Sequence, residues 1–135
     1  MKKQITFAIG LLLIFASLTS CKKNETATLK GKIVGRWQVA KIETTVSGLA
    51  TVTYTGVAAD YFDFRNNDAN EVVVAFNGTT YTGIYYVLIN DHLNITYNGK
   101  TRSAQVTTIT ANKLEFTASV DGASPQTTEK YYLTR

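Results

Sequence analysis

The sequence contains one cysteine, one histidine and one proline among its 135 residues. A single cysteine excludes an intramolecular disulfide framework and any metal site built from several cysteines. One histidine leaves few options for acid–base catalysis. We therefore expect no cofactor and no metal, and these scarcities argue against an enzyme.

Positive charge is also scarce outside the first part of the chain. The net charge is +4, but residues 1–32 hold six lysines and one glutamate. Residues 33–135 hold eight basic and nine acidic residues, which gives that part a net charge of −1. The basic excess belongs to the N-terminal segment, so we expect no nucleic acid as a partner.

The N-terminal segment has the organisation of an export signal. Lys2 and Lys3 precede a 14-residue apolar run from Ile5 to Leu18. This run is too short to span a bilayer comfortably but has the length of a signal-peptide core. The sequence therefore predicts a signal peptide over residues 1–20.

The apolar run ends in Leu18-Thr19-Ser20-Cys21. These four residues resemble the lipobox of bacterial lipoproteins, which implies that Cys21 becomes the acylated N-terminus and carries palmitate-type chains. Two or more acyl chains hold a protein stably at a membrane. The resemblance implies anchoring to a membrane of the cell envelope, with the outer membrane favoured. The alternative is an ordinary secretory signal followed by an incidental cysteine.

The segment after Cys21 is polar. Lys22 to Lys32 contains one large apolar residue, Leu29, and so buries too little surface to offset the entropy of ordering. The sequence predicts a lipidated cysteine and flexible tether over residues 21–32, with a reach of roughly 18 Å. The folded domain is then expected over residues 33–135.

The composition of residues 33–135 favours β-structure. Val, Ile and Thr account for 34 of these 103 residues. Such β-branched side chains fit a pleated surface better than a helix. Apolar and polar residues also alternate with a period of two, most clearly around Leu114, Phe116 and Ala118.

Turn residues divide this region into strands. Asn77-Gly78 and Asn98-Gly99 are typical of two-residue hairpins. The predicted strands cover residues 35–45, 50–56, 60–66, 71–77, 79–89, 92–98, 101–110, 112–120 and 127–134. Short links make an antiparallel meander, and closure into a barrel removes exposed edges. We expect an all-β fold, a small up-and-down barrel of about eight strands.

Six segments of the domain carry a family resemblance. In order, they are Ile33-Val34-Gly35-Arg36-Trp37, Tyr61-Phe62-Asp63-Phe64, Thr82-Gly83-Ile84-Tyr85, Leu93-Asn94-Ile95-Thr96, Asn112-Lys113-Leu114-Glu115-Phe116 and Tyr131-Tyr132-Leu133-Thr134-Arg135. Together they resemble lipocalins and the lipocalin-like lipoproteins of Bacteroidetes-type bacteria. The resemblance implies a lipocalin-like barrel across nearly all of residues 33–135, with Trp37 packed across its closed end. The chain is short for a lipocalin, which argues against a large ligand cavity.

Two polar motifs contain residue types that catalysis or metal binding could use. Asp91 and His92 are adjacent on a strand and face opposite ways, so a triad with Ser103 is disfavoured. Alternating oxygen ligands at Asn66, Asp68 and Asn70 could suit Ca²⁺, but the loop lacks the glycine and the distant glutamate of an EF-hand. A polar turn is the favoured interpretation of this loop.

Aromatic residues are the remaining feature. They could line a pocket for a small hydrophobic ligand or could fill the interior, and we favour a mostly filled interior. Binding of such a ligand is the first functional hypothesis, and interaction with an envelope protein or glycan is the second. The candidate ligand-binding residues are Trp37, Phe62, Phe64, Tyr85 and Phe116.

Overall fold

A computed structural model describes residues 28–135 of the chain. The predicted signal peptide, Cys21 and most of the predicted tether lie outside the described residues. One short helix and nine strands follow in order: α2 (Leu29–Ile33), β1 (Gly35–Val46), β2 (Val52–Thr55), β3 (Tyr61–Phe64), β4 (Glu71–Phe76), β5 (Thr79–Val87), β6 (His92–Tyr97), β7 (Lys100–Ile109), β8 (Lys113–Val120) and β9 (Thr127–Thr134).

The strands form one antiparallel sheet that closes on itself. From β3 to β9 each strand pairs with the next, and β9 pairs back onto β1 along Gln38 to Val46. The other edge of β1 pairs with β3 near its start and with β2 near its end. The result is an eight-stranded barrel with β2 as an extra strand, which confirms the predicted fold class.

Between β2 and β3 the chain leaves the sheet and returns to the same edge of β1. The Gly56 N–H donates to the Ala40 carbonyl at 3.0 Å, and the Val39 N–H donates to the Asp60 carbonyl at 3.0 Å. A Cβ on Gly56 would lie 1.9 Å from the Val39 carbonyl oxygen, so only glycine allows this approach. The interruption leaves β2 paired only with β1.

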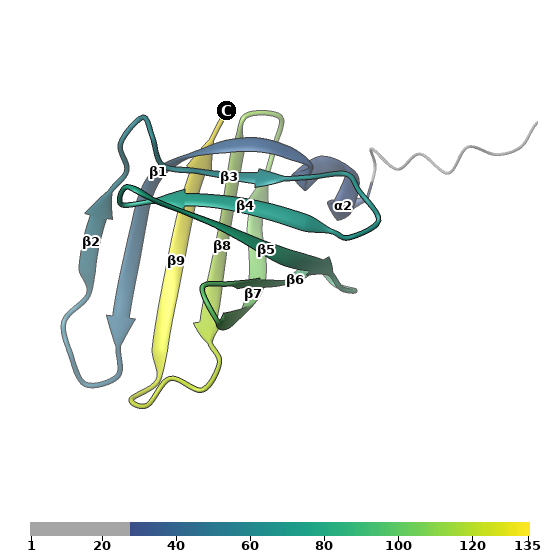
Figure 1. Ribbon diagram of the computed structural model, residues 1–135. Coiled ribbons are helices and arrows are strands. Elements are labelled where there is room, and N and C mark those ends of the chain that lie inside the picture. The colour runs from purple at the N-terminus through teal and green to yellow at the C-terminus, as the bar shows by residue number, and fades with distance from the viewer. Residues whose placement is uncertain (1–27) are drawn as a thin grey trace, which may run out of the picture.

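The two ends of the barrel differ (Figure 1). Helix α2 and the β3–β4 and β7–β8 connections lie at one end, called the closed end. The β1–β2 loop, the β8–β9 loop and the β4–β5 and β6–β7 turns lie at the other, called the mouth. Asn77 and Asn98 have positive φ angles of 49° and 51°, as two-residue hairpin turns require. The two predicted Asn-Gly turns are therefore present at the mouth.

Helix α2 covers the closed end, and its position corrects the predicted C-terminal limit of the tether. The hydroxyl of Thr28 accepts the Gly31 N–H at 3.2 Å and starts the helix, whose two apolar residues, Leu29 and Ile33, are buried in the barrel core. The flexible segment was predicted to extend to Lys32, but the folded region begins at α2. Burial of one helical turn against the barrel outweighs the polar composition of the surrounding sequence.

Below this cap the barrel is filled. The Trp37 indole N–H donates to the Ile33 carbonyl at 2.7 Å, and the Arg135 guanidinium lies 3.9 Å from the Trp37 ring. Phe62 packs edge-on against Phe116 and Tyr131, with ring centroids 6.3 and 5.6 Å away. We call this part of the barrel, from α2 down to Phe62 and Phe116, the closed half.

Candidate functional site

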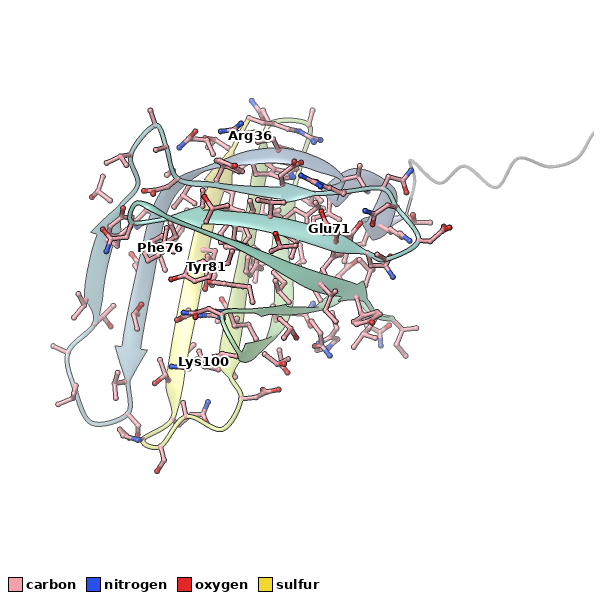
Figure 2. The ribbon with its side chains drawn as sticks, in the orientation of Figure 1. Arg36, Glu71, Phe76, Tyr81 and Lys100 are labelled. Atoms are coloured by element: carbon pink, nitrogen blue, oxygen red, sulfur yellow. The ribbon has the colours of Figure 1, made fainter. Side chains whose placement is uncertain are left out.

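The mouth half of the barrel contains a pocket of about 300 Å³. Strand alternation directs side chains of β1, β2, β4, β5, β6, β7 and β9 into it, and the two Asn-Gly turns supply its rim. Figure 2 shows Phe76 and Tyr81 on this side of the molecule, away from Glu71 near α2. The lining residues of this mouth pocket are Ile42, Thr44, Tyr54, Phe76, Asn77, Thr79, Tyr81, Tyr97, Asn98, Arg102, Glu129 and Tyr131.

Aromatic rings form two walls of the mouth pocket. Tyr54 of β2 and Phe76 of β4 meet edge to face with centroids 4.7 Å apart. Tyr81 of β5 lies 6.0 Å from Tyr97 of β6 in a tilted arrangement. These rings give the pocket flat apolar surfaces, of the kind that pack well against another ring or a rigid apolar group.

A polar layer separates the mouth pocket from the closed half. The Arg102 Nε–H donates to Glu129 Oε2 at 2.8 Å and lies 3.0 Å from the Tyr131 hydroxyl, which also donates to Glu129. The Arg102 guanidinium stacks on the Tyr97 ring at 3.9 Å. Arg102 is 8% exposed, so this ion pair is largely removed from bulk water.

The protonation states of the polar layer follow from its burial. Burial raises the pKa of Tyr97, and it raises the pKa of Tyr131 well above that of a free tyrosine. Burial alone would lower the pKa of Arg102, but Tyr131, Tyr97 and Glu129 together raise it. The two phenols therefore stay neutral and the guanidinium stays charged at any ordinary pH.

The guanidinium of Arg102 keeps donors that the protein does not use. Its Nε–H is engaged by Glu129 and Tyr131, and Nη1 makes a long contact of 3.4 Å to the Lys100 carbonyl. In the described part of the chain, every fully buried side-chain nitrogen or oxygen has a hydrogen-bond partner. Nη2 has none, so it must be reached by solvent, and Arg102 lines the mouth pocket.

A second hollow of about 430 Å³ lies beside the β8–β9 loop. We call it the outer pocket. It is bounded by Val46 at the end of β1, Val120 at the end of β8 and Lys100 at the start of β7. Figure 2 shows Lys100 at this lower side of the barrel. The remaining lining residues are Asp121, Gly122, Ala123, Ser124, Pro125 and Thr127.

Hydrogen bonds to Asp60 stabilise the wall of the mouth half where the sheet is interrupted. Its carboxylate accepts the Tyr54 hydroxyl at 2.6 Å, the Val57 N–H at 2.9 Å and the Asn77 N–H at 3.0 Å. Burial alone would raise the pKa of Asp60, but these hydrogen bonds lower it overall. A charged carboxylate therefore links β2 to the β4–β5 turn, where no strand pairing does so.

The five residues predicted from the sequence as ligand-binding are not at the mouth. Each is 0% exposed and none lines the mouth pocket. A side chain that lined a cavity large enough for water would keep some accessible surface. Their assignment to a ligand site is therefore corrected, because these residues are packed core: Trp37, Phe62, Phe64, Tyr85 and Phe116.

The residues of the Asp91-His92 motif and of the Asn66–Asn70 loop have partners within the protein. Ser103 donates to the Asp121 carboxylate at 3.1 Å and pairs across the sheet with Asn94, whereas His92 pairs with Gln105. In the β3–β4 loop, the Asn70 side-chain oxygen accepts from Lys30 at 2.9 Å and Glu71 pairs with Arg65. Cations of the protein thus occupy oxygens that a calcium ion would need.

Two further structural findings concern the whole described region. Within residues 28–135, no group of three His, Cys, Asp or Glu side chains is arranged to hold a metal ion. No helix in this same range is long and apolar enough to cross a membrane.

Sequence reasoning missed the polar layer and Asp60. Arg102 falls on the inward face of β7, in phase with Ala104 and Val106, and a charged residue at such a position was the available signal. Its partner Glu129 is 27 positions away, so their pairing emerges only when β7, β8 and β9 are in register.

An antiparallel barrel that is capped at one end and holds a pocket at the other defines a small cup-shaped β-barrel domain. Residues 33–116 match the family model of the lipocalin-like domain, which is well over half of the chain, so the chain belongs to this family. Among curated proteins, none matches the chain.

Proposed function

We propose that this lipocalin-like domain binds a small apolar molecule in the mouth pocket. The observation that carries the proposal is a pocket of about 300 Å³ with rings from Tyr54, Phe76 and Tyr81 above a buried Arg102–Glu129 pair. Binding sites for small molecules combine apolar walls with polar groups and begin at about this volume. Here polar atoms supply most of the exposed lining, and the ring faces supply the apolar part. The pocket is small, which favours a compact ring system over a long chain.

The proposal is for binding and not for catalysis. The hydroxyl of Ser103 is engaged with Asp121, and His92 lies opposite Gln105 on β7. Arg102, Glu129 and Tyr131 of the mouth pocket are linked to one another by hydrogen bonds. Such an arrangement supports recognition of a ligand more readily than proton transfer to it.

We also propose that the chain is a lipid-anchored envelope lipoprotein of the type found in Bacteroidetes-type bacteria. The support is the lipobox-like Leu18-Thr19-Ser20-Cys21 after the apolar run. Residues 21–27 are seven residues and could extend at most about 25 Å. Because helix α2 lies at the closed end, such an anchor would leave the mouth directed away from the membrane.

The ligand proposal is tested with phenylnaphthylamine, an uncharged probe with a naphthyl and a phenyl group, whose fluorescence rises in an apolar site. We expect saturable binding to the chain from residue 21 onward, which contains every described residue, with Cys21→Ser to remove the acyl group.

Tyr81→Ala should weaken binding of the probe about tenfold, since it removes one aromatic wall. Tyr86→Ala is the matched control, because Tyr86 is an exposed tyrosine of the same strand. Absence of saturable binding, or equal losses in both variants, would refute the proposal.

The anchor proposal is tested with labelled palmitate in cells. The wild-type chain should take up the label, and the Cys21→Ser variant should accumulate as an unprocessed, unlabelled precursor. Equal labelling of the two would disprove acylation at Cys21. Ser20→Ala keeps a small residue before the cysteine and is expected to be labelled normally.

A second candidate function is interaction with an envelope protein or glycan. The observation that favours it is the free edge of β2, which pairs only with β1 and carries Val52 at 68% exposure near Leu49 at 68%. An unpaired strand edge with apolar side chains is a site at which another chain can add. Failure of the probe to bind a folded wild-type barrel would make this the leading function.

A further inference from the structure

The charges that face the interior of the mouth half are unequal. Strand alternation directs Lys100 and Arg102 of β7 inward, in phase with the buried Ala104. Glu129 of β9 lies on the inward face with Tyr131 and Leu133. Two cations therefore lie on the inward face with one anion. Arg102 and Glu129 line the mouth pocket, and Lys100 lines the outer pocket.

The remaining acids nearby are directed elsewhere. Asp121 borders the outer pocket, but its carboxylate accepts from Ser103, an exposed residue on the outer face of β7. Asp60 belongs to the opposite wall, and both of its carboxylate oxygens are occupied by donors from Tyr54, Val57 and Asn77. Neither carboxylate forms an ion pair with the cations of β7, although Asp121 borders the outer pocket together with Lys100.

Both cations retain unused binding capacity. Glu129 is held by the Arg102 Nε–H and by the Tyr131 hydroxyl, which leaves Arg102 Nη2 without an acceptor. Lys100 forms no side-chain hydrogen bond or ion pair with any described residue, although Arg65, Lys113 and Lys41 each form ion pairs. A planar guanidinium edge and a free ammonium on one strand are suited to a carboxylate or sulfonate.

We propose that the ligand of the mouth is a small aromatic or alicyclic anion. Its anionic group would lie between Arg102 and Lys100, and its ring would lie against Tyr81 and Phe76. This inference rests on the proposed function, to which it adds the charge of the ligand and the residues that select it. Electrostatic attraction at the mouth also raises the encounter rate with anions.

The test compares two probes with the same ring skeleton. Anilinonaphthalene sulfonate is phenylnaphthylamine with one added sulfonate, so the pair differs in one negative charge. Both are titrated against the chain from residue 21 with Cys21→Ser. We expect the sulfonate to bind about tenfold more tightly or better, the effect of a charge-assisted hydrogen bond in a partly dry site. Added salt should reduce this advantage.

The variants separate the mouth from the net charge of the protein. Lys100→Gln should weaken sulfonate binding about threefold to fivefold, the effect of an exposed ion pair, and leave the uncharged probe unchanged. Lys32→Gln is the matched control, because Lys32 is an exposed lysine of α2 at the closed end. Arg102 is not substituted, since its loss would leave Glu129 as an unpaired charge in the polar layer.

The outcomes distinguish this inference from the proposed function. Equal affinities for the two probes would overturn the inference while leaving ligand binding intact. Equal losses in the Lys100 and Lys32 variants would also overturn it, because the anion would then respond to net charge alone. Tyr81→Ala should lower the affinity for both probes. If it lowers only the affinity for the uncharged probe, the sulfonate binds at another site and the inference is refuted. Failure of the uncharged probe to bind saturably would refute the proposed function itself.

Discussion

The closed half and the mouth half of this barrel are built from the same strands but differ in what fills them. In the closed half, rings such as Phe62 and Phe116 are fully buried and touch one another. In the mouth half, Tyr54 and Tyr81 have similar inward positions but line a pocket. Alternation along a strand therefore determines which side chains point inward, and the cap at one end determines whether they become core.

The polar layer marks the change between the two halves. Tyr131 packs its ring against Phe116 with centroids 4.6 Å apart, while its hydroxyl contacts Arg102 and Glu129. One residue thus belongs to the apolar core through its ring and to the mouth through its hydroxyl. Burying an ion pair costs desolvation energy, which attraction and hydrogen bonds offset only when they are well arranged. The polar layer therefore adds little to the free energy of folding. Its hydrogen bonds define where the packed core ends and the mouth pocket begins.

The largest expected effect of a mutation is in the closed half. Tyr85 is fully buried, packs against Phe64 with centroids 5.2 Å apart and donates its hydroxyl to the Arg65 carbonyl at 2.9 Å. Tyr85→Ala should lower the free energy of unfolding by about 3–5 kcal/mol, the range for truncation of a buried ring. Denaturant unfolding measures this change. Tyr85→Phe removes only the hydroxyl and should cost about 1 kcal/mol; a similarly small loss for alanine would mean that the closed half is not tightly packed.

An intermediate effect is expected at Asp60, in the wall of the mouth half. Asp60→Asn should lower stability at neutral pH by about 1–3 kcal/mol, because an amide cannot replace a carboxylate that accepts three donors. A carboxyl whose pKa falls on folding stabilises the protein above its unfolded pKa of about 4. That contribution is lost as the pH falls through the pKa of the folded state.

Measuring the stability difference between wild type and Asp60→Asn at several pH values separates the effect of charge from the effect of shape. The difference between wild type and Asp60→Asn, measured by denaturant unfolding, should be constant near neutral pH and should shrink below about pH 4. Asp68→Asn, in the exposed β3–β4 loop, should change stability by less than about 0.5 kcal/mol. A difference that persists in acid would show that the Asp60 charge is unimportant and that shape alone matters.

Much of the fold could be predicted from the sequence, because its signals are local. The Asn-Gly turns and the two-residue alternation around Leu114 gave strand limits close to those observed. Helix α2 could not be predicted, because Leu29 and Ile33 are only two apolar residues in a polar segment and their helix depends on the barrel they cap. The interruption at Gly56 likewise depends on contact with Val39 across the sheet.

The candidate site was less predictable because it depends on long-range register. The sequence reasoning selected large rings such as Trp37 and Phe64, which the structure assigns to the core. Size alone does not distinguish a ring that is covered by α2 from one that faces the mouth. The pairing of Arg102 with Glu129 required β7, β8 and β9 to be aligned, which no local pattern encodes.

A smaller effect on stability than at Tyr85 or Asp60 is expected at Tyr81, the counterpart of Tyr85 on the same strand and the same inward face. Tyr81 lines the mouth pocket, and its closest ring neighbour is Tyr97 at 6.0 Å. Tyr81→Ala should therefore lower the free energy of unfolding by no more than about 1 kcal/mol. It removes a ring that already borders open space, so it enlarges a pocket without creating a new cavity in packed surroundings.

Denaturant unfolding of the Tyr81→Ala and Tyr85→Ala variants, measured side by side, compares one residue type at two positions four residues apart. A loss at Tyr81 as large as that at Tyr85 would mean that the mouth half is packed like the closed half, and the contrast between them would fail.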